Sequence, residues 1–158
     1  MQNVFRRTRP HFPSVGKQTG AAAIEFAAVF ITFFAVFYAL VSYSLPLLMM
    51  QSFNAATTEA VRRAVAVSPT VAGYQGVVQT QASATVLSQL AWMPTALAFD
   101  QSNVTAVYDT TSKLLTVSVN YPVSKLANVL PPLVLPVIGR VPSLPTILTA
   151  QASLQLAP

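Results

Sequence analysis

The chain has 158 residues, of which 53% are hydrophobic and only 8% are charged, and its mean hydropathy is +0.55. Soluble proteins average about 25% charged residues, so this composition points toward a membrane. The formal net charge of +5 comes mainly from the first 20 residues, because the remainder carries five basic and four acidic side chains. No basic face persists beyond residue 20, which argues against nucleic-acid binding.

The first 20 residues form a basic segment that we expect to be a cytoplasmic leader. It contains four basic side chains and no acidic one: Arg6, Arg7, Arg9 and Lys17. Positive charges beside a membrane helix stay on the cytoplasmic side. The N-terminus is therefore expected in the cytoplasm, with the C-terminal portion outside it.

An uncharged run of 33 residues extends from Phe26 to Thr58. About 20 helical residues cross the hydrocarbon of a bilayer, so residues 21–50 are predicted to form a transmembrane helix with length to spare for tilt. A buried core helix is the alternative, but the rest of the chain could hardly cover such a helix on every side.

Pro46 interrupts this run and predicts a kink near residues 42–45, since proline lacks an N–H donor and crowds the preceding turn. The helix could instead end there and restart. A kinked but continuous helix is favoured, because the hydroxyls of Ser42 and Ser44 could satisfy the freed backbone group.

The informative motif stands at the start of the apolar run, where the sequence reads Gly-Ala-Ala-Ala-Ile-Glu-Phe from Gly20 to Phe26. Glu25 demands an explanation, because a carboxylate carried toward the membrane centre costs on the order of 2–3 kcal/mol. Cleavage after Gly20 would create an α-amino group on Ala21, one helical turn before Glu25, that could neutralise it. A glutamate that simply reaches the lipid headgroups is the alternative.

This arrangement of basic leader, glycine, glutamate at the fifth following position and apolar helix resembles a type IV prepilin cleavage site. The string GAAAIEFAAV and its apolar span are similar to the TadE/TadG-like proteins of the tight-adherence (Flp) pilus system, strongly across residues 17–45 and only in composition beyond. In that family a prepilin peptidase cuts after the glycine. The resemblance implies that Gly20 ends the leader, Ala21 starts the mature chain, and Glu25 and Phe26 are its fifth and sixth residues.

Beyond Met50 the apolar residues recur every three or four positions, which predicts that the helix continues to about Val67 and ends at Ser68-Pro69. This part should bury one stripe, on its own domain in the favoured interpretation or on a partner helix in the other. Helical spacing returns between Val77 and Trp92.

Alternation of apolar and polar residues predicts three strands, at residues 104–108, 115–121 and 147–156, with a hairpin turn at 109–113 between the first two. Prolines interrupt the apolar stretch from Val129 to Val141, which is too broken for a second spanning helix. We expect this stretch to pack on the sheet or to form a hydrophobic contact surface.

These elements predict an α+β fold: a long N-terminal transmembrane helix that continues into an extracytoplasmic helix, then a small antiparallel sheet of about three strands packed on helix. The expected domains are a leader at 1–20, a transmembrane helix at 21–50 and an extracytoplasmic domain at 51–158.

Residues with catalytic chemistry are few. Cysteine is absent, and the single histidine, His11, lies in the leader. The spacing of Glu59, Asp100 and Asp109 suggests no convergent pair, and the sequence contains no phosphate loop, dinucleotide fingerprint or metal-ligand cluster. We therefore expect no enzyme, no cofactor, no metal site and no small-molecule substrate.

The favoured function is a TadE-like pseudopilin or assembly component of a Flp (Tad) pilus, a bitopic inner-membrane protein processed after Gly20. The expected partners are prepilin peptidase, other Tad pilus and pseudopilin subunits, the inner-membrane assembly platform and the lipid bilayer. Two alternatives stay open: an uncleaved membrane-anchored binding or sensor module, and a minor pseudopilin of a type II secretion machine.

Overall fold

The computed structural model describes residues 19–135 and 139–156 of the chain. Two α-helices are present in these ranges, α1 (Thr19–Ala64) and α2 (Tyr74–Gln89). The strands are β1 (Val104–Asp109), β2 (Leu114–Pro122), β3 (Leu133–Leu135), β4 (Gly139–Val141) and β5 (Ile147–Gln155). Short 3-10 helices lie at Thr95–Leu97, Gln101–Asn103 and Val123–Asn128.

Contacts divide the chain between Phe37 and Tyr38. The described part of the first unit is the N-terminal portion of α1, all of it helical. The second unit begins within the same helix, so α1 is shared between them.

The main sheet has three strands in the order β1-β2-β5, with both pairs antiparallel. Val119 on the central strand stands opposite Val104 on one side and Ala150 on the other. Because side chains alternate across a strand, one face of β2 carries its four buried residues: Leu115, Val117, Val119 and Tyr121.

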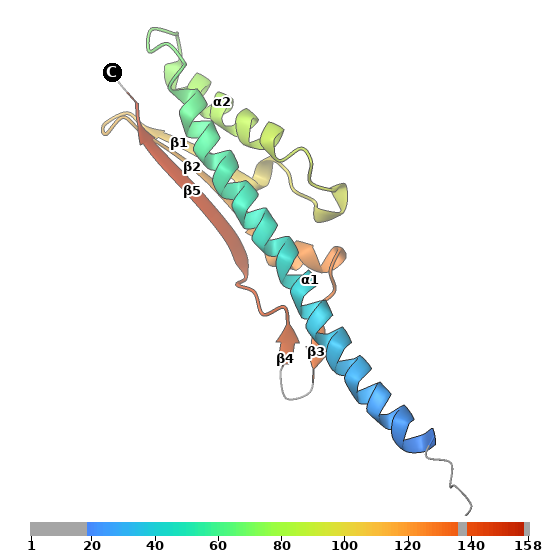
Figure 1. Ribbon diagram of the computed structural model, residues 1–158. Coiled ribbons are helices and arrows are strands. Elements are labelled where there is room, and N and C mark those ends of the chain that lie inside the picture. Colours follow the sequence, from blue (N-terminus) through green and yellow to red (C-terminus); the bar gives the residue numbers. More distant parts are fainter. Residues whose placement is uncertain (1–18, 136–138, 157–158) are drawn as a thin grey trace, which may run out of the picture. The chain divides into compact units, whose positions relative to one another are not determined.

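The C-terminal part of α1 and helix α2 contribute to the same hydrophobic core as this face of β2, together with residues of β1, β5 and the connecting segments (Figure 1). Phe53 of α1 is fully buried, and its ring centroid lies 5.7 Å from that of Phe99 and 6.0 Å from that of Tyr121. Helix α2 adds Val78, Ala82 and Val86. The buried stripe of α1 extends over more than five turns: Ser42, Pro46, Met49, Phe53, Ala56, Thr57, Ala60, Val61 and Ala64.

The predicted α+β architecture is confirmed, including the long first helix and the antiparallel sheet of three strands packed against helix. Helix α1 ends at Ala64 rather than near Val67. The reason is a tighter turn at its end, where the Ala66 N–H bonds the Arg63 carbonyl and the Val67 N–H bonds the Ala64 carbonyl, three residues back instead of four.

Two further elements differ from the sequence prediction. Helix α2 begins at Tyr74, three residues early, because Gly73 adopts a positive φ of 70° that glycine accommodates readily and starts the helix there. The proline-rich stretch forms a separate hairpin, in which β3 pairs with β4 and neither joins the main sheet. This hairpin was not predicted.

Candidate processing site and membrane helix

The residues of the predicted processing site all lie on the first two turns of α1. Gly20, Ala21, Glu25 and Phe26 are helical and exposed. The four basic residues predicted to set the topology, Arg6, Arg7, Arg9 and Lys17, lie outside the described residues.

Gly20 has no packing role within the described chain. A Cβ atom added at this position would meet nothing within 4 Å. Glycine costs a helix about 0.5–1 kcal/mol relative to alanine, so the fold alone would accept a better helix former here. An explanation for glycine at this position must come from something outside the described fold.

Glu25 lies four residues after Ala21, and this spacing puts both residues on one face of the helix. The first turn of α1 contains no acidic residue, because the helix starts at Thr19 and Glu25 falls in the second turn. The macrodipole acts mainly within the first turn, so the uncut helix offers Glu25 little stabilisation. Among the described residues, ion pairs involve Glu59 and Asp100, not Glu25.

The surface around this site is apolar on every side. Phe26, Phe30 and Phe34 stack along one row with ring centroids 6.0 and 6.3 Å apart, and Phe33 stacks on Phe37 at 6.3 Å. All five rings are more than half exposed. A helix with apolar side chains all round needs an apolar environment, which residues 19–135 and 139–156 do not supply here.

Within the described residues, α1 is the one helix long and apolar enough to cross a membrane. Its most apolar window of 18 residues has a mean hydropathy of 2.3, and none of that window is buried. These properties fit a single-pass membrane protein.

Helix α1 continues without a break through Pro46, which is buried. Proline has no N–H, so the carbonyl of Ser42, four residues before Pro46, loses its helical hydrogen bond. The two serine hydroxyls were expected to satisfy this freed group, but they bond other carbonyls. The Ser42 hydroxyl donates to the Ala39 carbonyl (3.0 Å), and the Ser44 hydroxyl donates to the Leu40 carbonyl (2.5 Å). The kink at Pro46 stays a prediction.

Two tyrosines tie α1 to the proline-rich segment, a role that the sequence analysis missed. The Tyr38 hydroxyl donates a hydrogen bond to the Pro131 carbonyl. The Tyr43 hydroxyl accepts one from the Ser143 N–H at 2.9 Å. Tyrosines late in an apolar run are typical of a membrane interface, and the sequence indicates nothing more about these two. The residues that they bond lie about 100 positions away in the sequence, and no local sequence pattern predicts these hydrogen bonds.

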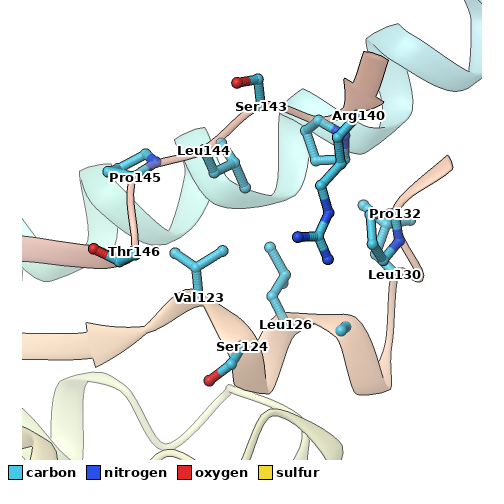
Figure 2. A pocket seen from close by; sticks show the side chains of 12 residues that line it. Val123, Ser124, Leu126, Leu130, Pro132, Arg140, Ser143, Leu144, Pro145 and Thr146 are labelled. Atoms are coloured by element: carbon cyan, nitrogen blue, oxygen red, sulfur yellow. The ribbon is translucent and has the colours of Figure 1, made fainter. Parts of the chain in front are cut away.

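Two cavities, each of about 430 Å³, lie in the second unit. Figure 2 shows the first, with the guanidinium group of Arg140 extending between Leu126 and Pro132. No acidic, histidine or cysteine side chain lines either cavity. The second cavity lies between α1 and the start of β5 with the residues just before it. Its lining residues are Tyr43, Pro46, Leu47, Met50, Leu144, Pro145, Ile147, Leu148 and Thr149.

Two acidic side chains of the second unit interact with residues close to them in the sequence. Glu59 pairs with Arg62 at 2.7 Å and with Arg63 at 2.6 Å on the surface of α1. The pKa of Asp100 lies below its usual value because the Ser102 hydroxyl and N–H both donate to its carboxylate. No group of three or more histidine, cysteine, aspartate or glutamate side chains able to hold a metal occurs in residues 19–135 and 139–156.

Comparison with known protein families matches residues 20–62 to the family described as TadE-like protein. The match covers most of α1 and ends two residues before its C-terminal end, so none of the strands is included. No curated protein and no solved structure matches the chain significantly.

Proposed function

We propose that this chain, which is TadE-like over residues 20–62, is a membrane protein associated with the Tad pilus and, more specifically, a pseudopilin-like assembly component cut after Gly20. The observation that carries the proposal is the exposed Gly-Ala-Ala-Ala-Ile-Glu-Phe segment at the start of an apolar helix that the protein leaves uncovered. Within the residues that the structure describes, nothing covers the bond after Gly20.

Cleavage changes the electrostatics of the site. The new amino group of Ala21 carries a positive charge four residues before Glu25, and the mature helix now begins there, which brings Glu25 closer to the positive end of the dipole. Two unit charges 4 Å apart attract by roughly 4 kcal/mol at an effective dielectric constant near 20. This is comparable to the roughly 2.5–3.5 kcal/mol that a charged residue costs at the centre of a membrane helix. Neutralisation at such a distance, within one chain or between neighbouring subunits, would therefore offset the cost of Glu25 when the helix enters an assembly.

The proposed topology has the leader in the cytoplasm and the domain outside it, in the bacterial inner membrane. The cluster of Glu59, Arg62 and Arg63 supports this orientation, because the salt bridges partly cancel the two arginine charges on the C-terminal side of the span. The four basic leader residues on the other side have no acidic neighbour in the sequence.

The proposed partners follow from this role. They are prepilin peptidase, other Tad pilus and pseudopilin subunits, the inner-membrane assembly platform and the lipid bilayer. We propose neither an enzymatic activity nor a cofactor, nucleic acid or small-molecule substrate.

The N-terminus of the membrane-extracted protein tests the proposal directly. In cells with an active prepilin peptidase, intact mass and N-terminal sequencing should give a chain that begins at Ala21. A Gly20→Leu variant should keep the leader, because the bulky side chain blocks the cut. An Ala28→Leu variant makes a comparable change on the exposed helix outside the motif and should be cut normally. A wild-type chain that retains its leader in such cells would identify an uncleaved membrane anchor instead.

A second variant separates processing from assembly. Glu25→Gln removes the charge but preserves the shape of the side chain, so cleavage should proceed while piliation is lost. Loss of protein secretion with normal piliation would instead indicate the minor pseudopilin of a type II secretion machine.

A further inference from the structure

An exposed apolar surface lies on the segment that leads into and forms the β3–β4 hairpin. Its described side chains include Val134, which is 74% exposed, Val129 at 41% and Leu133 at 38%. Arg140 is the one charged residue in the sequence from Ala127 to the end of the chain. No other described element of the protein covers Val134, and apolar patches of this kind mark contact surfaces.

The hairpin is held beside the part of α1 where a membrane span should end. Tyr38 and Tyr43 fix it there through the Pro131 carbonyl and the Ser143 N–H. A span of about 20 residues that begins at Ala21 ends near residue 40. Four exposed side chains on this part of α1 are also apolar: Leu40, Val41, Leu47 and Leu48. The hairpin therefore adds apolar surface beside the end of the proposed span.

The backbone of this segment is suited to the interface of a bilayer rather than to its hydrocarbon. Pro131 and Pro132 have no N–H to satisfy, and the Pro131 carbonyl accepts the Tyr38 hydroxyl. Strands β3 and β4 pair with each other over three residue pairs, and no other described strand joins this sheet. The outer edge of each strand therefore needs water or lipid headgroups as hydrogen-bond partners, which the interface supplies and the hydrocarbon does not.

Arg140 fits the edge of a bilayer rather than its interior. It stands opposite Val134 in the β3–β4 register, so the two side chains leave the hairpin on one face. An arginine at this position can rest its aliphatic part on apolar surface while its guanidinium reaches lipid phosphates. In Figure 2 the guanidinium lies among apolar side chains, without an acidic residue near it.

We infer that the β3–β4 hairpin rests in the outer interface of the lipid bilayer, as a second membrane contact beside α1. Lipid is the occupant that this surface fits, because the surface is tied to α1 at Tyr38 and Tyr43, beside exposed apolar residues of that helix, and carries one cation and no acid. The contact holds the domain against the membrane surface instead of letting it stand away on an extended helix. The inference rests on the proposed single-pass topology.

Site-directed spin labelling can test this contact, because the chain has no cysteine and a single introduced one is labelled uniquely. The full-length protein is placed in liposomes of phosphatidylethanolamine and phosphatidylglycerol with a label at Val134→Cys. Leu40→Cys serves as the lipid reference. Val107→Cys is the matched control, a valine on β1 that is 52% exposed but belongs to the main sheet. Collisions of each label with oxygen, which enters lipid, and with a water-soluble nickel chelate are compared.

The ratio of oxygen to nickel collisions at residue 134 should be several-fold higher than at residue 107 and should approach that at residue 40. A ratio at residue 134 equal to that at residue 107 would overturn the inference. So would a label shielded from both reagents, since that result indicates a second protein copy on the surface. If residue 40 itself were in water, the span would end before this residue and the inference would fail, whereas the proposed function would still be decided by the N-terminus of the extracted protein. Should Val134→Cys not fold, Leu133→Cys, at the neighbouring and partly exposed position of β3, replaces it.

Discussion

Phe53→Ala should destabilise the domain by about 4 kcal/mol. Phe53 is fully buried on α1, and its ring contacts Phe99 and Tyr121 at centroid distances of 5.7 and 6.0 Å. Truncation of a buried phenylalanine costs about 3–5 kcal/mol, and loss of two aromatic pairs moves the expected value toward the middle or upper part of that range. The fall in Tm per kcal/mol of destabilisation decreases with domain size, and the second unit, Tyr38–Pro158, is of intermediate size. At roughly 3–4 °C per kcal/mol, the Tm of Phe53→Ala should be lower by roughly 12–16 °C.

The assay is thermal unfolding of the full-length protein in detergent micelles, followed by near-ultraviolet circular dichroism. Phe37→Ala is the matched control, since this residue lies on the same helix but is 54% exposed. It should leave the Tm of the domain nearly unchanged. Phe53→Leu keeps part of the buried volume and should lower the Tm by a smaller amount, which secures the comparison if Phe53→Ala does not fold. Equal Tm values for the variants at positions 53 and 37 would refute the assignment of α1 to the domain core.

Two further predictions concern single hydrogen-bonded side chains. Tyr121→Phe should lower the free energy of unfolding, measured by denaturant titration, by about 1–3 kcal/mol. The buried hydroxyl of Tyr121 donates to the Leu97 carbonyl at 2.8 Å, and its loss leaves that carbonyl unpaired. A change below about 0.5 kcal/mol would contradict this prediction. The pKa of Asp109 is lowered because the Ser112 hydroxyl and the Thr111 N–H donate to its carboxylate. A lowered pKa stabilises the folded state above the ordinary aspartate pKa, and this contribution is lost as the pH falls through the folded value. Asp109→Asn should therefore reduce the loss of stability on acidification, and a nuclear magnetic resonance titration of Asp109 that gives an ordinary or raised pKa would show the cause to be wrong.

The strands of the main sheet could be read from the sequence almost to the residue. Alternation at 104–108 and 115–121 predicted β1 and β2, and the structure extends them by one or two residues. The period of two is a local property, since it depends only on one face of a strand being buried. The β3–β4 hairpin gave no such signal, because each of its strands is only three residues long and those of β3 are apolar at consecutive positions.

The candidate site was also a local inference. Gly20, Ala21, Glu25 and Phe26 were identified from their order and from the apolar helix that follows, and α1 contains all four on its exposed first turns. The hydrogen bonds of Tyr38 and Tyr43 could not be inferred in this way. Their partners, Pro131 and Ser143, lie in a segment with no regular pattern.

By itself, the sequence determined that a long apolar helix follows a basic leader, that a glutamate interrupts its start, and that an antiparallel sheet comes after it. Only the tertiary structure decided that from Tyr38 onward this helix also belongs to the core of the domain, with Ser42, Pro46 and Met49 buried. The physical reason is that an uncharged run has the same pattern whether lipid or protein surrounds it. What distinguishes the two halves of the helix is the surface packed against them, and that surface is built by residues far along the chain.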